Sequence, residues 1–277
     1  WEFPKDWTAR KNQETFLKEL TEAINTSSKP NLKISIAVGG ETKGSVNHTQ
    51  YINKNALQYA DEIHVMAYDF PSNNYDNNNH STYTDAIGAF DGWAAFGADK
   101  SKMTLCIPFY GRSADRWNDV MYSQLSSNNT TFANDQASYG GKTYYYNGKT
   151  TLESKTEYVM SNGGFGIAIW DLGQDKTGQY SLLSTVYDKM NTLCAAPQPK
   201  LGPDQGVCGD ISITLDASVS SASGRVIEWY KDGSKISGSS STLNVSAAGV
   251  YKVVVTQDEC ERTDEVEIAS GASISGS

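Results

Sequence analysis

The sequence predicts an α/β domain that forms part of a (β/α)8 TIM barrel, followed by a smaller all-β sandwich. The barrel is indicated by four apolar strands that alternate with helices and that each end in polar or aromatic residues. Strands that are apolar on both faces are typical of a buried parallel sheet. Because a complete barrel needs eight strands and ~250 residues, we expect residues 1–194 to supply only about strands five to eight, with the front half ahead of Trp1.

The helices of the first domain are predicted from apolar periodicity. The first is expected over residues 8–25, with Thr8 as its cap. Its apolar face carries Phe16, Leu20 and Ile24, which recur at helical spacing. Further helices are expected at 48–59, 82–97, 152–162 and 179–191.

Apolar runs closed by glycine or polar clusters predict the four strands of the sheet. The strands are expected at 31–39, 62–69, 102–108 and 165–170. A polar loop of Asn, Asp, Ser and Tyr follows the second strand at residues 72–80. A hairpin is expected in the irregular stretch after the third strand, at Tyr144–Gly148, because Asn-Gly is a turn signal.

A change of composition marks the second domain. Residues 195–203 are rich in proline and predict a linker. Short alternating segments in residues 204–269 predict an antiparallel sandwich with Trp229 in its core. Its strands are expected at 212–215, 226–230, 242–245, 250–256 and 265–268. Residues 270–277 are rich in Gly and Ser and predict a flexible linker.

Charge and hydropathy exclude two classes of partner. The chain of 277 residues has a net charge of −9, shared as −4 before Pro197 and −5 from Pro197 onward, so no nucleic-acid phosphate track is expected. No window approaches the ~20 apolar residues of a membrane span, so no membrane insertion is expected. Aromatic content is 11% and charged content only 20%, which favours a neutral ligand that stacks on rings, such as a sugar.

The cysteines predict one disulfide and no metal site. Cys208 and Cys260 bracket the second domain, so we expect them to bridge its first and last strands. Cys106 lies in an apolar run and is expected to be a buried thiol, and Cys194 has no obvious partner. The sequence holds no CxxC or HxxxH spacing, and its three His residues are scattered, so neither a zinc site nor a cofactor is expected.

Four short motifs follow one another in the first domain. They are Trp1-Glu2-Phe3-Pro4, Met66-Ala-Tyr-Asp69, Ile107-Pro-Phe-Tyr-Gly-Arg112 and Gly166-Ile-Ala-Ile-Trp170 with Asp175 after it. In this order and spacing they resemble glycoside hydrolase family 18, the chitinase-like enzymes. The first resembles the end of the family signature, in which a strand with spaced aspartates ends in a Trp-Glu pair, and the other three resemble the family's motifs on the sixth, seventh and eighth strands. The resemblance covers residues 1–192. The second domain resembles, more loosely, the immunoglobulin-like modules of secreted polysaccharide-degrading enzymes.

The resemblance implies hydrolysis of β-1,4-linked N-acetylglucosamine polymers or oligomers by a substrate-assisted retaining mechanism. Glu2 is the implied general acid and base, which protonates the glycosidic oxygen. The substrate's own acetamido oxygen attacks the anomeric carbon, and water opens the resulting oxazolinium. An acid that works near neutral pH needs a pKa raised by burial or by a neighbouring carboxylate. The alternative for Glu2 is a surface side chain at the start of the chain.

The resemblance also assigns roles to three residues at the end of the second strand. Tyr68 is expected to hold the acetamido group for attack, and Asp69 to bind the sugar or the surroundings of Glu2. Met66 is expected to pack beneath the reacting sugar. The alternative is a core tyrosine at a strand end beside a helix-capping aspartate.

Further binding residues are implied on the later strands. Tyr110 and Arg112 are expected to bind sugar hydroxyls or the acetamido carbonyl, the alternative for Arg112 being a structural salt bridge. Trp170 is expected to stack beneath the sugar, the alternative being a core position. Trp93 and Trp117 are possible outlying platforms, although packing is favoured for both.

The sequence departs from the family where the signature aspartates should precede Trp1-Glu2. We therefore expect this chain alone to be inactive, and to associate with itself through the open face of its half-barrel. The parent protein is expected to be secreted and to bind chitin or another N-acetylglucosamine-containing glycan. Two alternatives remain: an endo-β-N-acetylglucosaminidase that cuts glycoprotein glycans, favoured by a small insertion between Arg112 and Gly166, and a non-catalytic chitin-binding lectin.

Overall fold

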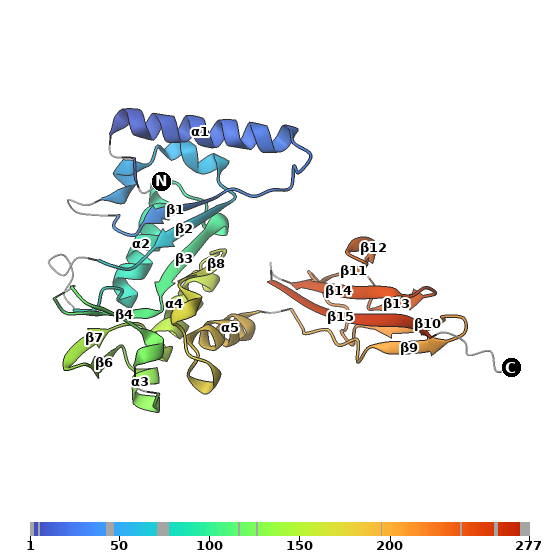
Figure 1. Cartoon of the computed structure of the whole chain (residues 1–277). Helices are drawn as coiled ribbons and strands as arrows, with labels where there is room; N and C mark the ends of the chain where they lie inside the picture. Colours follow the sequence, from blue (N-terminus) through green and yellow to red (C-terminus); the bar gives the residue numbers. More distant parts are fainter. Residues whose placement is uncertain are drawn as a thin grey trace. The chain divides into compact units, whose positions relative to one another are not determined.

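The structure is a computed structural model of the chain. It describes residues 3–4, 6–42, 47–70, 78–115, 117–125, 127–194, 196–238, 240–257 and 260–271. The chain divides into two compact units, Trp1–Leu193 and Cys194–Ser277, which are drawn from blue to yellow and from orange to red in Figure 1. Each unit has its own hydrophobic core.

The first unit is built on a parallel sheet of four strands in the order β1-β2-β3-β8. The strands are β1 (Ser35–Gly39), β2 (Glu62–Met66), β3 (Met103–Pro108) and β8 (Gly166–Trp170). Strand β3 is buried at every position, whereas the edge strands β1 and β8 are partly exposed. This sheet confirms the predicted mixed α/β architecture and is consistent with part of a family 18 barrel.

Five α-helices and six 3-10 helices are present in the described part of the first unit. The α-helices are α1 (Trp7–Thr26), α2 (Tyr83–Phe96), α3 (Asn129–Ala133), α4 (Lys149–Ser161) and α5 (Leu182–Leu193). The 3-10 helices are η2 (His48–Tyr51), η3 (Lys54–Tyr59), η5 (Lys100–Lys102), η6 (Tyr122–Gln124), η7 (Leu172–Gln174) and η8 (Gly178–Tyr180).

Two helix predictions were wrong in detail. Helix α1 is capped by Asp6, whose side chain accepts a hydrogen bond from the Ala9 amide, and not by Thr8. The single helix expected over residues 48–59 is instead the pair η2 and η3. The buried Ile52 between them is extended, and Asn53 caps the second segment with its side chain, so the local hydrogen bonds start a new turn there.

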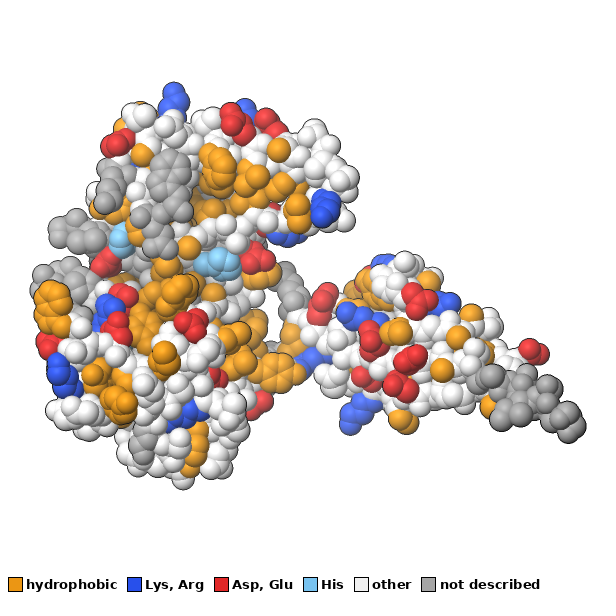
Figure 2. Space-filling model, in the orientation of Figure 1, with side chains coloured by type: hydrophobic (Ala, Val, Ile, Leu, Met, Phe, Trp, Pro, Cys, Tyr) orange, Lys and Arg blue, Asp and Glu red, His pale blue; other side chains and the backbone are white. Residues whose placement is uncertain are grey.

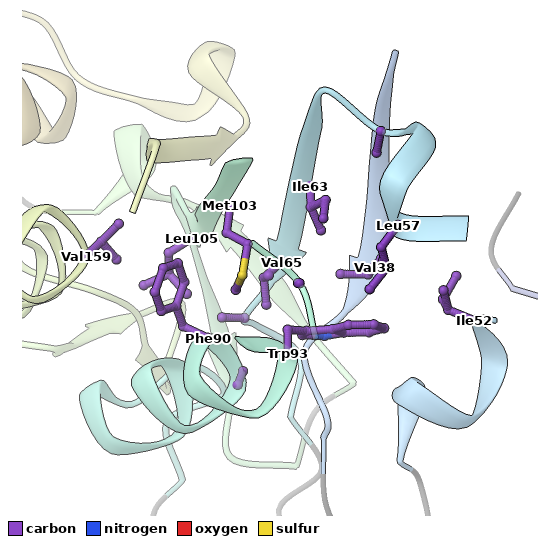
Figure 3. Packing of buried hydrophobic residues seen from close by; sticks show 14 of the residues in the cluster. Val38, Ile52, Leu57, Ile63, Val65, Phe90, Trp93, Met103, Leu105 and Val159 are labelled. Atoms are coloured by element: carbon purple, nitrogen blue, oxygen red, sulfur yellow. The ribbon is translucent and has the colours of Figure 1, made fainter. Parts of the chain in front are cut away.

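Helix α2 covers the sheet and carries the largest side chain of the core. Trp93 is fully buried, and its indole nitrogen donates to the Gly39 carbonyl at 2.9 Å. Figure 3 shows its ring among the side chains that α2 and the strands contribute to this cluster. They include Val38, Ile63, Val65, Phe90, Met103 and Leu105. Trp93 is therefore a core residue and not a sugar platform.

A second, antiparallel sheet follows β3 in the order β5-β4-β7-β6. Its strands are β4 (Tyr110–Ser113), β5 (Asp119–Met121), β6 (Gln136–Tyr139) and β7 (Lys142–Tyr145). The hairpin turn lies at Gly140 and Gly141, both with positive φ, so the predicted turn at Tyr144–Gly148 was misplaced. Gly148 instead precedes α4, and a Cβ on it would lie 2.2 Å from the Asn134 carbonyl oxygen.

The second unit is β-rich, with two sheets that share one core around the fully buried Trp229. A five-stranded sheet has the order β12-β11-β14-β15-β9, and β10 pairs with β13. The strands are β9 (Gln205–Cys208), β10 (Ile213–Asp216), β11 (Val226–Lys231), β12 (Ser234–Gly238), β13 (Thr242–Val245), β14 (Gly249–Gln257) and β15 (Cys260–Gly271). Asp232 and Gly233, both with positive φ, form the turn between β11 and β12.

Part of each segment that was expected to be a linker belongs to the second unit. In the proline-rich segment, the Lys200 amide donates to the Ala217 carbonyl and the Leu201 amide to Asp264, so this segment packs on the unit. Strand β15 continues to Gly271, and residues 272–277 lie outside the described part. Figure 2 shows acidic side chains gathered on the visible face of this unit, in keeping with its negative charge.

The expected bridge between Cys208 and Cys260 was wrong. Cys260 is bonded to Cys194, with a Cα–Cα distance of 5.5 Å. The cause is the register of the sheet: β9 pairs in parallel with the far end of β15, so Cys208 lies beside Gly271. Cys208 is a free, exposed thiol, and Cys106 is a buried one, as predicted. Burial raises the pKa of the Cys106 thiol to about 12. None of the helices that the structure describes is long and apolar enough to cross a membrane.

Replacing Cys194 by serine should destabilise the second unit. The bridge closes a loop with a sequence separation of 66 residues, for which chain entropy gives a contribution of about 4 kcal/mol. Denaturant unfolding of the Cys194→Ser chain should show this loss, and the Cys208→Ser chain is the matched control and should unfold as the unaltered chain does. Equal stability of the two variants would contradict the prediction.

Candidate active site

Polar and aromatic side chains meet at the carboxyl edge of the parallel sheet. Met66 ends β2, Pro108 ends β3 and Trp170 ends β8, and the register pairs Pro108 with Trp170. Because parallel strands point the same way, the residues that follow the last residue of each strand lie at the same edge of the sheet. Barrel enzymes have their active sites at this edge. Tyr68 and Asp69 are the second and third residues after β2, and the strand β4 starts two residues after β3.

The Asp69 carboxylate is the centre of this cluster. Its Oδ1 accepts a hydrogen bond of 2.6 Å from the Tyr110 hydroxyl. The same oxygen lies 3.1 Å from Arg112 Nη1 and 3.1 Å from His80 Nδ1. Arg112 is held in turn by Asp119, which accepts from Nε at 2.7 Å and from Nη2 at 3.0 Å. The backbone of Asp69 is left-handed, with φ 60°, an uncommon conformation for a residue other than glycine.

The electrostatics keep Asp69 charged and Tyr110 neutral. Burial acts to raise the pKa of Asp69, but hydrogen bonds from His80 and Tyr110 and the charges of His80 and Arg112 outweigh it and hold the pKa below its usual value. Burial, with the neighbouring Asp69 charge, raises the pKa of Tyr110 far above its usual value. At neutral pH the pair is thus a carboxylate acceptor and a hydroxyl donor, which suits binding of hydroxyl and amide groups and not proton donation by Asp69.

The other predicted site residues differ in their contact with the Asp69 cluster and in their exposure. The Tyr68 ring lies edge-on to the Tyr110 ring, with 6.2 Å between their centroids. Met66 is half-buried at the end of β2. Trp170 is 58% exposed, so it is not a core residue, and its peptide bond to Asp171 is cis. Glu2 lies outside the residues that the structure describes.

The structure also decides some of the alternatives for these residues. Thr82, not Asp69, caps the helix that follows, since its side chain accepts from the Asp85 amide. The salt bridge expected as an alternative for Arg112 is present, to both Asp69 and Asp119, so Arg112 is tied into the cluster. Trp117 is 88% exposed, and its role as a platform stays a prediction.

Sequence reasoning missed His80 and Asp119. Both contact the central cluster, but His80 is separated from Asp69 by eleven positions and Asp119 from Arg112 by seven. His80 was one of three scattered histidines. Its position between the polar loop and the start of a helix was the one indication that the chain comes back to the end of β2 at this residue. Asp119 carried no signal before the strand pairing between Arg112 and Asp119 was known.

A parallel α/β unit that presents a carboxylate, a guanidinium, tyrosines and an exposed indole at its strand ends has the make-up of a carbohydrate-processing barrel domain. Comparison with known proteins agrees. Residues 1–175 match the family Glycosyl hydrolases family 18. The chain belongs to glycoside hydrolase family 18, with a chitinase-like domain over these residues.

Individual relatives match part of the chain. Endochitinase 1 of Metarhizium anisopliae is 22% identical over 231 residues, which cover 69% of this chain and 54% of that protein. The GH18 chitinase ChiB from the chitin utilization locus of Flavobacterium johnsoniae is 31% identical with a TM-score of 0.53, covering 66% of this chain and 57% of the other. The chain thus spans just over half the length of these relatives.

Two plant proteins share the fold. A chitinase-like agglutinin of Robinia pseudoacacia is 23% identical, with a TM-score of 0.56, and the match covers 68% of this chain and 66% of that one. The class V chitinase of Nicotiana tobaccum, solved as a mutant in complex with NAG4, is 22% identical with a TM-score of 0.52 and the same two coverages.

Replacing Tyr110 by phenylalanine should raise the pKa of Asp69, because the variant loses the hydroxyl that donates to Oδ1. A carboxyl group with a lowered folded-state pKa stabilises the fold above its ordinary pKa, and that contribution is lost as the pH falls through the folded value. Acid unfolding of Tyr110→Phe should therefore begin at higher pH than in the unaltered chain.

The pKa of Asp69 can be followed directly by the ¹³C chemical shift of its carboxyl carbon. Tyr139→Phe, at an exposed tyrosine on β6, is the control and should leave this pKa in place. An unchanged pKa in Tyr110→Phe would refute the assignment of the hydrogen bond.

Proposed function

We propose that this protein is a chitinase-type glycoside hydrolase that cleaves β-1,4-linked N-acetylglucosamine polymers or oligomers. The observation that carries the proposal is the Asp69 carboxylate, held by Tyr110 and Arg112 beside the Tyr68 ring, at the strand ends of a family 18 domain. Such a cluster offers a charged acceptor and neutral and cationic donors within one site. Sugar hydroxyls and an acetamido group need this combination.

The proposed reaction is substrate-assisted and retains the anomeric configuration. Glu2 donates its proton to the glycosidic oxygen as the bond to the anomeric carbon breaks. The acetamido oxygen of the same sugar attacks that carbon, and Glu2 then takes a proton from the water that opens the oxazolinium. Binding energy that orients the acetamido group for this attack lowers the barrier of an intramolecular step.

The remaining residues would bind and orient the sugar. Tyr68 holds the acetamido group, and Asp69 accepts from a sugar hydroxyl or acts on the surroundings of Glu2. Tyr110 and Arg112 contact hydroxyls or the acetamido carbonyl. Trp170 places its exposed ring face under the apolar face of the sugar. Met66 packs below the same ring.

The second unit is proposed to be an immunoglobulin-like spacer over residues 204–269. Residues 195–203 are proposed to join it in sequence to the catalytic domain at 1–194. The disulfide between Cys194 and Cys260 fits an oxidising compartment, so the protein is proposed to be secreted.

A lectin is the second candidate, because the chitinase-like agglutinin of Robinia pseudoacacia shares this fold. An endo-β-N-acetylglucosaminidase is the third, as it would use the same acid and acetamido chemistry on glycoprotein glycans. Neither alternative requires a different arrangement of Asp69, Tyr110 and Arg112. A turnover assay with several substrates is needed to separate the three candidates.

The assay uses a fluorogenic chitobioside between pH 5 and 8 with the full-length protein and its Glu2→Gln variant. We expect turnover by the full-length protein and a loss of at least ~100-fold in Glu2→Gln, because general acid catalysis is removed.

The assay also includes soluble chito-oligosaccharides and a high-mannose glycoprotein. Chitin binding without turnover by the full-length protein would favour the lectin, and release of glycans alone would favour the endoglycosidase. Either outcome would overturn the proposed chitinase.

A further inference from the structure

A buried polar segment lies directly behind the Asp69 carboxylate. Asn79, His80 and Ser81 are all less than 4% exposed. Asn79 donates through its side chain to the Tyr146 carbonyl at 2.8 Å, and Ser81 Oγ donates to the Ala67 carbonyl at 2.6 Å. The segment therefore joins the end of β2 to the residues that precede α4.

One face of this segment is held by a lysine from α4. Lys155 is fully buried, and its Nζ donates to Ser81 O and Ser81 Oγ, both at 2.8 Å, and to Asn147 Oδ1 at 2.7 Å. An ammonium group has three hydrogens, and here each has one acceptor. Asn147 closes the group by donating to the Ser81 carbonyl at 2.8 Å.

All three acceptors of Lys155 are uncharged, which makes this site unusual. Burying an ammonium group without a carboxylate in contact is costly, so a hydrophobic residue would pack here at lower cost. Helix α4 packs against α2 and against β3 and β8, as Figure 1 shows, so the lysine is fixed on a rigid part of the unit. A buried charge that contacts only neutral groups needs a reason other than stability.

The other face of the segment reaches the candidate active site. His80 Nδ1 lies 3.1 Å from Asp69 Oδ1 and 3.3 Å from the Asp69 amide nitrogen. The Phe70 amide donates to the His80 carbonyl at 3.1 Å. The His80 ring also lies 5.0 Å from the Tyr110 ring, centroid to centroid. The position of His80 thus fixes both the backbone and the carboxylate of Asp69.

We propose that Lys155 is a positioning residue of the candidate active site. It fixes the segment 79–81 from behind, and this segment sets His80 against Asp69 so that the carboxylate keeps its orientation toward a ligand. The inference rests on the proposed function for its effect on turnover, but the effect on Asp69 itself does not depend on which reaction is catalysed.

The ionisation of Lys155 gives the proposal a measurable consequence. Burial lowers the pKa of Lys155 to about 7, against the charges of Asp135 and of Asp85 on α2, which raise it. The ionisable His80 belongs to the segment that Lys155 binds. Above this pH the neutral amine has two hydrogens for its three acceptors. The hydrogen bonding of Lys155 to Ser81 is then weaker, and Asp69 becomes less well oriented.

The test compares Lys155→Met with Lys149→Met in the full-length protein. Both substitutions lie on α4, but Lys149 is exposed and pairs with Glu153. We expect Lys155→Met to lower kcat on the chitobioside at least tenfold and to remove the decline of kcat above pH 7, whereas Lys149→Met behaves as the unaltered protein. If Lys155→Met loses thermal stability but keeps kcat, KM and the pH profile, the residue is structural only and the proposal is overturned.

A second measurement needs neither a variant nor turnover. In the unaltered protein, the ¹³C shift of the Asp69 carboxyl carbon should change with the same midpoint as the ¹⁵N shift of Lys155 Nζ. An Asp69 signal that is flat through this midpoint overturns the proposal, even if Lys155→Met does not fold. If the full-length protein lacks hydrolytic activity, the proposed function fails, and this NMR titration still tests the positioning role.

Discussion

The Asp69 carboxylate is the group on which the candidate active site depends. It receives the Tyr110 hydroxyl and the Arg112 guanidinium from β4, and the His80 ring from the segment ahead of α2. Three parts of the chain that are distant in sequence are thereby joined at one oxygen atom. Because charge-assisted hydrogen bonds are stronger than neutral ones and strongly directional, moving any one donor would shift the others.

The sheet makes this meeting possible. Strand β3 lies between β2 and β8 and is buried at all its positions, so its direction and register leave little freedom. Core packing has the density of an organic crystal and a low compressibility, so such a framework restricts the movement of the strand ends. Tyr110 follows β3 and Asp69 follows β2, so the separation between their side chains is set by one pair of neighbouring strands. The polar site is precise because the apolar framework beneath it is rigid.

Much of this framework could be predicted from the sequence, because apolar periodicity and strand-end motifs are local signals. The four parallel strands, the helix expected over residues 82–97 and the buried Trp229 all follow from patterns within a few residues. Long-range pairings were not predictable in this way. The partner of Cys260 depended on how β9 joins β15, and the contact of His80 with Asp69 depended on how the chain returns after the loop.

The burial of Lys155 could not be predicted from the sequence either. In sequence it is one polar position on an amphipathic helix, where a solvated lysine is the common outcome. Its burial becomes visible only when Ser81 and Asn147 are placed around it. The backbone of Asp69 is a second costly feature of the site. A left-handed residue other than glycine costs about 1–3 kcal/mol, and it persists only where the surrounding structure holds it in that conformation. Glycine at position 69 would remove that strain, but it would also remove the carboxylate. The strained Asp69 and the buried Lys155 are therefore best explained together, because both serve to keep a charged oxygen at the edge of the sheet.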